Sequence, residues 1–229
     1  MKTSLSALRT ASRPRNERWD PVLFYSGQDP ASVSGALRMI LLALLAVLLA
    51  CTAARSEEKA ILGEGLALKM DYIDFTDGFL SNNGLDKSVY VGLEAYAHVA
   101  QPIYLGVEAG VANPSGTVGG QRTELTYVPI ELNVKYVNEF MPGTNFSVGG
   151  GMSANHVSET VVSAGNVFSD NAWLLGGQIF SELLFSSGNF FAGFNVKYQF
   201  TDNMVGADGA VPAHRFSNWR LGGLGGFYF

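Results

Sequence analysis

The sequence predicts an all-β chain: an eight-stranded antiparallel up-and-down transmembrane β-barrel, preceded by a signal-peptide helix. The first observation is that apolar and polar residues alternate with a period of two from Lys59 onward, between clusters of Gly, Asn, Asp, Pro and Ser. The second is that only 15% of the 229 residues are charged while 27 are glycine, whereas soluble domains average about 25% charged residues. Only one uncharged apolar run is long enough to consider as a helical span, which excludes a polytopic helical membrane protein.

The first element is a leader, and its charge differs from that of the rest of the chain. Residues 1–55 carry seven basic and three acidic side chains, which leaves a net charge of −9 on the remaining 174. Arg38 precedes the apolar run from Met39 to Ala50, and small residues lead to the charged stretch at Arg55. This pattern predicts a secretory signal peptide. We therefore expect a misassigned or disordered extension at 1–38, the signal core and cleavage region at 39–54, and the barrel domain at 59–229.

Cys51 is the one cysteine of the chain, so neither an internal disulfide nor a thiolate zinc cluster can form. It follows Leu48-Leu49-Ala50 in a pattern similar to a lipobox, which makes it a possible lipid attachment site. Ordinary cleavage after Ala53 or Ala54 is the alternative. The acidic body also argues against a nucleic-acid partner, because phosphate binding needs a basic face.

Eight segments of the body alternate as strands do. In residues 190–200, Phe190, Phe194 and Val196 share one face, while Asn195 and Lys197 lie on the other. The expected strands are 60–75, 88–100, 103–112, 124–137, 146–157, 173–185, 190–200 and 218–229. Short connections alternate with longer ones at 76–87, 113–123, 158–172 and 201–217, so long loops are expected at one end and short turns at the other. Pro129 removes a ladder donor within a strand, and we expect a β-bulge there.

The alternation alone does not say which face is inside, because a soluble sandwich or a lipocalin-like barrel also alternates. Strands of this length suit a bilayer crossing better than a soluble sheet. The polar face is rich in glycine, which suits a crowded lumen: Gly92, Gly106, Gly110, Gly149, Gly151, Gly193 and Gly222. Aromatic residues gather near strand ends, as interfacial girdles require: Tyr72, Phe75, Trp173, Phe185, Phe190, Phe200, Trp219, Phe227 and Phe229.

With the polar face inward, nine charged side chains are expected to form a lumen charge network. They are Lys69, Asp71, Glu94, Glu108, Glu131, Lys135, Glu182, Lys197 and Arg220. Buried charges are costly unless they are paired, and five acids with four bases are nearly balanced. An eight-stranded barrel is narrow enough to be filled by its own side chains. We therefore expect a plugged barrel and no open pore.

The last strand ends on Phe229, and Leu221 and Phe227 share its face. This arrangement is similar to the C-terminal signal read by the outer-membrane barrel assembly machinery. With Tyr127–Tyr136, Phe146–Gly151 and the leader, residues 59–229 resemble the small eight-stranded outer-membrane β-barrel family of the OmpA and OmpX type. The resemblance implies a Gram-negative outer membrane, with lipids and lipopolysaccharide around the barrel and the assembly machinery as a partner. We expect no periplasmic domain after Phe229, so the resemblance does not extend to the peptidoglycan-binding half of OmpA-type proteins.

His214 and Ser217, followed by Asn218, resemble the His-x-Ser-Asn motif of barrel-shaped lipid A deacylases. Here two residues separate the histidine from the serine, and no acid follows Ser217 to complete a triad. His98 and His156 have no neighbouring ligand at metal spacing. We therefore expect no catalytic residues, metal or cofactor.

These residues favour a non-enzymatic protein with a structural or surface-interaction role through its loops. A narrow conduit of the OmpW type and a lipid A-modifying enzyme are the alternatives. A soluble periplasmic or lipid-anchored β protein is a third class. The sequence does not identify the partner of the external loops.

Overall fold

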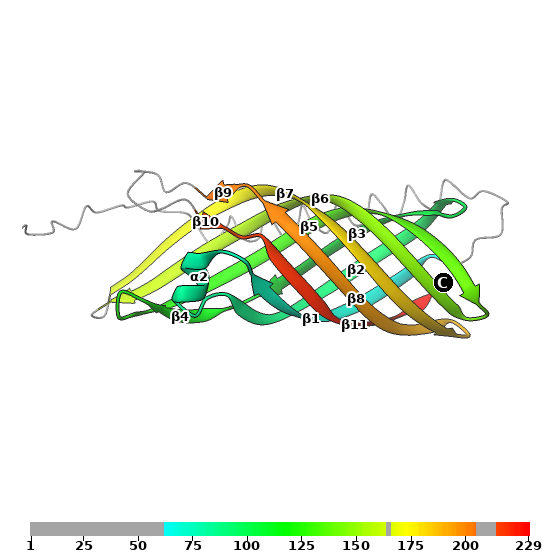
Figure 1. The fold of residues 1–229 in the computed structure, drawn as a ribbon, viewed down its shortest axis with the longest axis horizontal. Helices are drawn as coiled ribbons and strands as arrows, with labels where there is room; N and C mark the ends of the chain where they lie inside the picture. Colours follow the sequence, from blue (N-terminus) through cyan, green and yellow to red (C-terminus); the bar gives the residue numbers. More distant parts are fainter. Residues whose placement is uncertain (1–61, 164–165, 205–213) are drawn as a thin grey trace, which may run out of the picture.

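The computed structural model describes residues 62–163, 166–204 and 214–229, and strands dominate it (Figure 1). The elements are β1 Gly65–Phe75, α2 Gly78–Asn82, β2 Lys87–Ala100, β3 Ile103–Ala112, β4 Ser115–Val118, β5 Gln121–Met141, β6 Thr144–Ser163, β7 Asn166–Ser187, β8 Phe190–Thr201, β9 Asn203–Met204, β10 His214–Arg215 and β11 Asn218–Tyr228. The expected extension, signal peptide and Cys51 lie outside the described residues. In the described part of the chain, no helix is long and apolar enough to cross a membrane.

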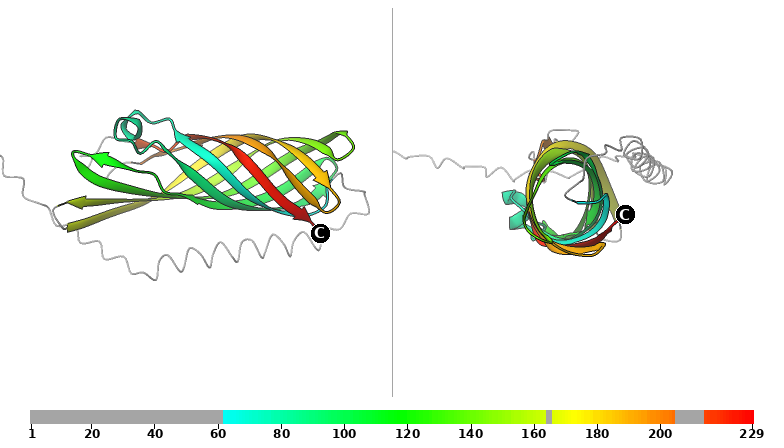
Figure 2. Two further views of the ribbon diagram at one scale, coloured as in Figure 1. Left: turned by 90° about the horizontal axis from the view of Figure 1, so that it is seen from below. Right: turned by 90° about the vertical axis from the view of Figure 1, so that its right-hand side faces the viewer.

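Eight of the strands close into a ring, which is visible end-on in Figure 2. The order is β3-β2-β1-β11-β8-β7-β6-β5, and β3 pairs with β5 to complete the circle. Every pairing is antiparallel, and the first and last strands meet from Gly65↔Tyr228 to Phe75↔Asn218. The short β4 pairs only with β5, outside the ring. The predicted eight-stranded up-and-down barrel is confirmed.

The two ends of the barrel differ, as predicted from the connection lengths. Three tight turns, at residues 101–102, 142–143 and 188–189, lie at the same end as Gly65 and Tyr228. We call this the turn end; it is on the right in Figure 1. The opposite, loop end carries α2, β4 and the small β9–β10 hairpin on the left.

Three strands run further than the sequence indicated. β5, β6 and β7 have 21, 20 and 22 residues, and the β6–β7 pairing continues without a break to Ser163↔Asn166. The expectation of a long loop at 158–172 is therefore wrong, because continuous cross-strand pairing satisfies the backbone beyond the ring. The expected loop at 113–123 contains the β4–β5 hairpin, whose two-residue turn places Gly119 and Gly120 at φ +58° and +81°, as a type I′ turn requires.

The bulge expected at Pro129 is also wrong. Pro129 faces Asn155 of β6 within an unshifted register. On its other side, β5 pairs with β3 at Ala109↔Ile130 and again at Ala112↔Tyr127, which is the same register on both sides of the proline. A bulge inserts an extra residue into one strand. Here no residue is inserted, and the β3–β5 pairing is only interrupted next to the proline, which has no N–H to donate.

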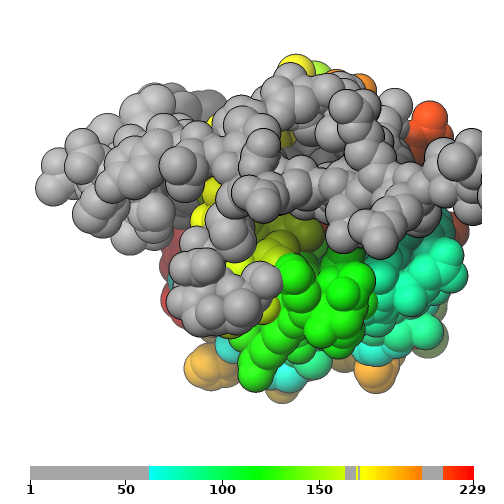
Figure 3. Space-filling view, turned by 90° about the vertical axis from the view of Figure 1, so that its left-hand side faces the viewer, coloured from blue at the N-terminus to red at the C-terminus, as the bar shows by residue number. Residues whose placement is uncertain are grey.

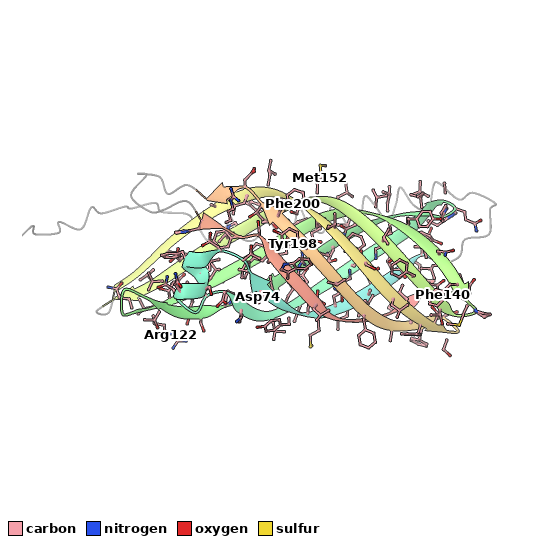
Figure 4. The ribbon with its side chains drawn as sticks, viewed as in Figure 1. Asp74, Arg122, Phe140, Met152, Tyr198 and Phe200 are labelled. Carbon is pink, nitrogen blue, oxygen red and sulfur yellow. The ribbon has the colours of Figure 1, made fainter. Side chains whose placement is uncertain are left out.

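The outward face of the ring is apolar. Large side chains on it, such as Met152, Leu175 and Phe190, are 69%, 69% and 70% exposed. Figure 4 shows the outward Phe140 toward the turn end and Arg122 at the loop end. Eight of the nine aromatic residues expected at the girdles are exposed. Phe75 is the exception: it is 2% exposed, because its position on β1 points it inward, so its assignment to a girdle is wrong.

Glycines on the inner face make room for large lumen side chains. A Cβ on Gly110 would lie 2.4 Å from the ring of Tyr90, and one on Gly149 would lie 2.3 Å from the ring of Phe180. Real Cβ atoms do not approach other atoms so closely, so both positions require glycine for this packing. The glycine-rich inner face predicted from the sequence is therefore the space into which the aromatic rings pack.

The loop end is held together by short elements. Asp77 caps the N-terminus of α2 by accepting from the backbone N–H of Phe79 at 2.8 Å, and its other carboxylate oxygen accepts from the N–H of Arg215 at 3.1 Å. The N–H of Thr117 in β4 donates to the carbonyl of Asn83 at 2.9 Å. Figure 3 views this end and shows the green β4–β5 hairpin next to the blue-green α2 region.

Candidate functional site

The nine charged residues singled out from the sequence all lie inside the barrel. Each is at most 3% exposed: Lys69, Asp71, Glu94, Glu108, Glu131, Lys135, Glu182, Lys197 and Arg220. They come from seven of the eight ring strands, because each strand turns every second side chain inward. Eight of the nine form one connected set of ion pairs, which we call the lumen network.

Lys69 of β1 is the centre of the half of the lumen network nearer the turn end. Its Nζ lies 2.9 Å from a carboxylate oxygen of each of Glu94, Glu108 and Glu182. Lys135 contacts Glu94 at 2.7 Å and Glu182 at 2.9 Å. Two ammonium groups thus share two carboxylates, and Glu108 links them to the other half.

Glu108 of β3 holds the second half. One oxygen accepts from Lys197 Nζ at 2.7 Å, and the other accepts from Tyr90 OH at 2.8 Å and from Arg220 Nη1 at 3.2 Å. Lys197 and Arg220 both also bond Glu131. Removing charges from water costs several kcal/mol per ion, and this density of partners is what offsets that cost.

The ring of Phe180 adds an aromatic surface to the lumen network. The Nζ atoms of Lys69, Lys135 and Lys197 lie 5.9, 5.7 and 5.4 Å from its centroid, within the range of cation–π attraction. Phe180 therefore packs among three cations. This role was not predictable from the sequence, since Phe180 interrupts the polar pattern of its face.

Apolar side chains close the lumen on both sides of the network. The turn-end cluster contains Leu62, Ala67, Tyr96, Tyr104, Val137, Leu184, Phe191 and Leu224. The loop-end cluster contains Ile73, Phe75, Leu80, Leu85, Tyr90, Ala112, Leu125, Tyr127, Val157, Leu174 and Phe216. Along β1, Ala67 precedes Lys69 and Ile73 follows it, so the charges lie between the two clusters. Buried side chains thus occupy the described interior at three levels, one charged and two apolar.

The segment before β1 contributes to this closure. Leu62 is 5% exposed within the turn-end cluster. The hydroxyl of Tyr104 accepts from the N–H of Leu62 at 2.8 Å and donates to its carbonyl at 3.0 Å. One side chain thus satisfies both backbone groups of Leu62 and holds the chain in the mouth of the barrel.

A polar layer that sequence reasoning missed lies between the lumen network and the loop-end cluster. Tyr127 OH contacts Asn155 Oδ1 at 2.8 Å and Gln199 Oε1 at 2.7 Å, and Arg220 donates to Gln199 at 3.0 Å. Asn155 and Gln199 are fully buried. Their inward parity was readable from the sequence, but they carry no charge to draw attention to them.

The histidine and serine compared with a deacylase motif are engaged elsewhere. The ring of His214 stacks on Phe79 with centroids 4.1 Å apart. Ser217 Oγ accepts from the N–H of Thr201 at 3.1 Å, and Asn218 donates to the carbonyl of Phe216 at 2.9 Å. Among the described residues no hydrogen bond joins His214 to Ser217, whereas a serine nucleophile is activated by an adjacent general base.

The remaining histidines contact aromatic rings. His98 lies 5.2 Å from Tyr104 and His156 lies 5.0 Å from Trp173, between ring centroids. Within the described ranges, no group of three or more His, Cys, Asp or Glu side chains could hold a metal ion.

The three residues of the expected assembly signal lie on the outer face of the last strand or just after it. Leu221, Phe227 and Phe229 are 65%, 44% and 62% exposed, and the rings of Phe227 and Phe229 are 6.1 Å apart. Phe227 and Phe229 stand together at the turn end, whereas Leu221 lies in the loop-end half of β11, opposite Tyr72 of β1.

No model of a known protein family matches the sequence, and the comparison with curated proteins found no match. Solved structures do match. Neisserial surface protein A (NspA) superposes with a TM-score of 0.52 at 9% identity, covering 73% of this chain and 97% of that one. Ail, the attachment invasion locus protein of Yersinia pestis, gives 0.49 at 12% identity, covering 73% and 100%.

The outer membrane protein OprG from Pseudomonas aeruginosa matches with a TM-score of 0.48 at 13% identity, covering 74% of this chain and 98% of that one. At these identities the likeness concerns the fold. The chain has the fold of the small outer-membrane β-barrels, as the resemblance in its sequence indicated.

Proposed function

We propose that the protein is a closed outer-membrane barrel that presents a rigid surface for interaction outside the cell. In this orientation the turn end faces the periplasm and the loop end faces outward, as in barrels with short periplasmic turns and longer external loops. Lipids and lipopolysaccharide surround the apolar wall, and the face with Leu221, Phe227 and Phe229 would engage the barrel assembly machinery.

The observation that carries the proposal is the contrast between a filled lumen and an extended exterior. A tilted strand crosses a bilayer in about 9 to 11 residues, yet β5, β6 and β7 have 20 to 22. The excess lies at the loop end, where β5 and β6 remain paired to Arg122↔Val162. This extension is a paired sheet, so it can present a surface of defined shape.

A narrow conduit is the second candidate function, but the ion pairs and apolar clusters in the lumen oppose the passage of a solute. Nine ion pairs and two apolar clusters would have to part before a solute could pass. The purified barrel is therefore expected to be silent in planar lipid bilayers. Regular single-channel steps from the wild-type protein would overturn the closed-barrel proposal.

The surface role is tested by shortening the extension. A variant that lacks residues 159–170, with a two-residue turn in their place, keeps the whole ring and removes the tip of the β6–β7 hairpin. Cells producing it should adhere less than wild-type cells to surfaces coated with extracellular-matrix proteins, at equal amounts of heat-modifiable barrel in the outer membrane. Equal adhesion of the two strains, above that of cells without the protein, would contradict a role for the extension.

The enzymatic alternative has its own readout. Mass spectra of lipid A from cells that overproduce the wild type and the Ser217→Ala variant should be the same as those of cells without the protein. Loss of an acyl chain in the wild type alone would establish the deacylase alternative.

A further inference from the structure

Asp71 stands apart from the other lumen charges. The ion pairs use four carboxylates, those of Glu94, Glu108, Glu131 and Glu182, and four cations, those of Lys69, Lys135, Lys197 and Arg220. Among the described residues, no basic nitrogen lies within 4.0 Å of the Asp71 carboxyl group, although that residue is 1% exposed. An ionised Asp71 would therefore be an uncompensated buried charge, which is strongly unfavourable.

The neighbour of Asp71 inside the barrel is Asn195. β11 separates the two, and Gly222 is the residue paired with both of them. A Cβ on Gly222 would lie 2.3 Å from Asp71 Oδ1, so the glycine leaves the gap across which the side chains meet. Asn195 Nδ2 donates to Asp71 Oδ2 at 3.2 Å.

Two buried oxygens of this pair have no partner. Asp71 Oδ1 and Asn195 Oδ1 are both buried, and neither receives a hydrogen bond from the residues that the structure describes. Both are acceptors when Asp71 is ionised, so nothing in the pair can satisfy either of them. Buried polar atoms are nearly always hydrogen-bonded, and two orphaned acceptors on side chains that already contact each other indicate a missing donor.

We propose that Asp71 is a proton-binding site, with the proton held on Oδ1 and donated to Asn195 Oδ1. A protonated carboxyl has one O–H to donate, so a single proton satisfies both orphaned oxygens. Together with the observed Asn195 bond it closes a ring of two hydrogen bonds between acid and amide. The lumen is then neutral, with four carboxylates and four cations.

A metal cation is a poorer occupant for the same space. Calcium takes about six to eight oxygen ligands and magnesium about six, whereas two orphaned side-chain oxygens are available here. The charged and titratable groups around Asp71 are already committed to one another. They are Lys69 on β1, Tyr90 on β2, Glu108 on β3, Glu182 on β7, Lys197 on β8 and Arg220 on β11.

The proposal gives a sign for the pH dependence. In the unfolded chain an aspartate releases its proton above about pH 4, whereas the folded barrel retains it, so the folded state binds more protons. Stability then falls as pH rises. Relative to a variant without this proton, the unfolding equilibrium constant of the wild type should rise about tenfold per pH unit until the folded Asp71 ionises.

The matched variant is Asp71→Asn. Its amide can donate to Asn195 Oδ1 and accept from Asn195 Nδ2, so it keeps both bonds without a titratable proton. Infrared spectra of the refolded barrel near neutral pH should show the C=O stretch of a protonated carboxylic acid. The band should shift on labelling aspartate with 13C at the side-chain carbon, disappear in Asp71→Asn, and remain in the control Asp74→Asn, on the outward face of the same strand.

A wild-type spectrum without an aspartate-derived carboxylic acid band would overturn the proposal, and this measurement does not depend on folding of a variant. Urea unfolding provides the second readout. The ratio of wild-type to Asp71→Asn unfolding constants should rise from about pH 5 to about pH 8, and a ratio independent of pH would contradict the proposal. Stabilisation of the wild type alone by Na⁺, K⁺ or Mg²⁺ would assign the site to a metal cation instead.

Discussion

Replacing Lys69 with methionine removes the ammonium that joins the two halves of the lumen network while keeping a side chain of similar length. Three contacts of 2.9 Å are lost, to Glu94, Glu108 and Glu182. Each of these carboxylates keeps at least one other cation, since Lys135 contacts two of them and Lys197 the third. Removing one partner of a buried ion pair costs about 3 to 5 kcal/mol, and the remaining partners place the expected loss near the lower figure.

The assay is urea unfolding of the barrel in lipid vesicles, followed by the fluorescence of Trp173 and Trp219. Both are about half exposed on the outer wall, at 53% and 52%, so they report its loss. With a slope of about 2 kcal/mol per molar urea, a loss of about 3 kcal/mol lowers the midpoint by about 1.5 M. The control is Lys87→Met, because Lys87 is a surface lysine 3.6 Å from Asp86. It should change stability by less than about 1 kcal/mol.

A second variant separates charge imbalance from lost packing. Combining Lys69→Met with Glu182→Gln removes one cation and one anion, so the network is balanced again. It should be more stable than Lys69→Met alone. If Lys69→Met is no less stable than the Lys87→Met control, or if the double variant loses the sum of both single effects, the reasoning from charge pairing is refuted.

Three further changes test other parts of the fold by the temperature at which the barrel loses its heat-modifiable gel mobility. Gly110→Val places a Cβ 2.4 Å from the ring of Tyr90 and should lower stability by about 1 to 3 kcal/mol or prevent folding. The control Gly223→Ala, whose Cβ would have no atom nearer than 3.5 Å, should leave stability nearly unchanged. Equal loss of stability in both variants would contradict the packing of Tyr90 against Gly110. Tyr104→Phe removes both hydrogen bonds to the backbone of Leu62. It should lower stability by about 1 to 3 kcal/mol and speed proteolysis of the segment before β1. An unchanged rate of proteolysis would show that these hydrogen bonds do not hold the segment in place. Asp77→Ala removes the α2 cap at a cost of about 1 kcal/mol, with faster amide exchange in α2 as the readout.

Parity along the strands made the barrel and its inner face predictable from the sequence. Lys197, for example, is predicted to point inward because its neighbours two residues away, Asn195 and Gln199, are polar and those one residue away are apolar or aromatic. The partners were not predictable in the same way. Lys69 and Glu182 are 113 residues apart in the sequence, and only the strand register and the width of the ring decide that they meet. For the same reason the sequence predicts Asp71 as part of the network, although no basic nitrogen of the described residues lies within 4.0 Å of its carboxyl group.

The two apolar clusters were missed because they interrupt the alternation. Leu184 and Phe191 depart from a pattern in which apolar residues point outward, because both point inward and pack in the turn-end cluster. Alternation describes a membrane wall with a polar lumen, and it fails wherever the lumen itself becomes apolar. Local sequence likewise could not reveal that β6 and β7 continue beyond the ring, since their loop-end residues are small and polar in composition.

The seam between β1 and β11 has a consequence for how the chain reaches its membrane. The pairing of Gly65 with Tyr228 joins the beginning and the end of the described barrel, so any shorter chain leaves two rows of backbone amides and carbonyls without partners. In hydrocarbon each such group costs several kcal/mol, and a partial sheet is therefore not a stable resident of the bilayer. A stable wall in the bilayer therefore requires the complete ring, which the eleven-residue β11 closes.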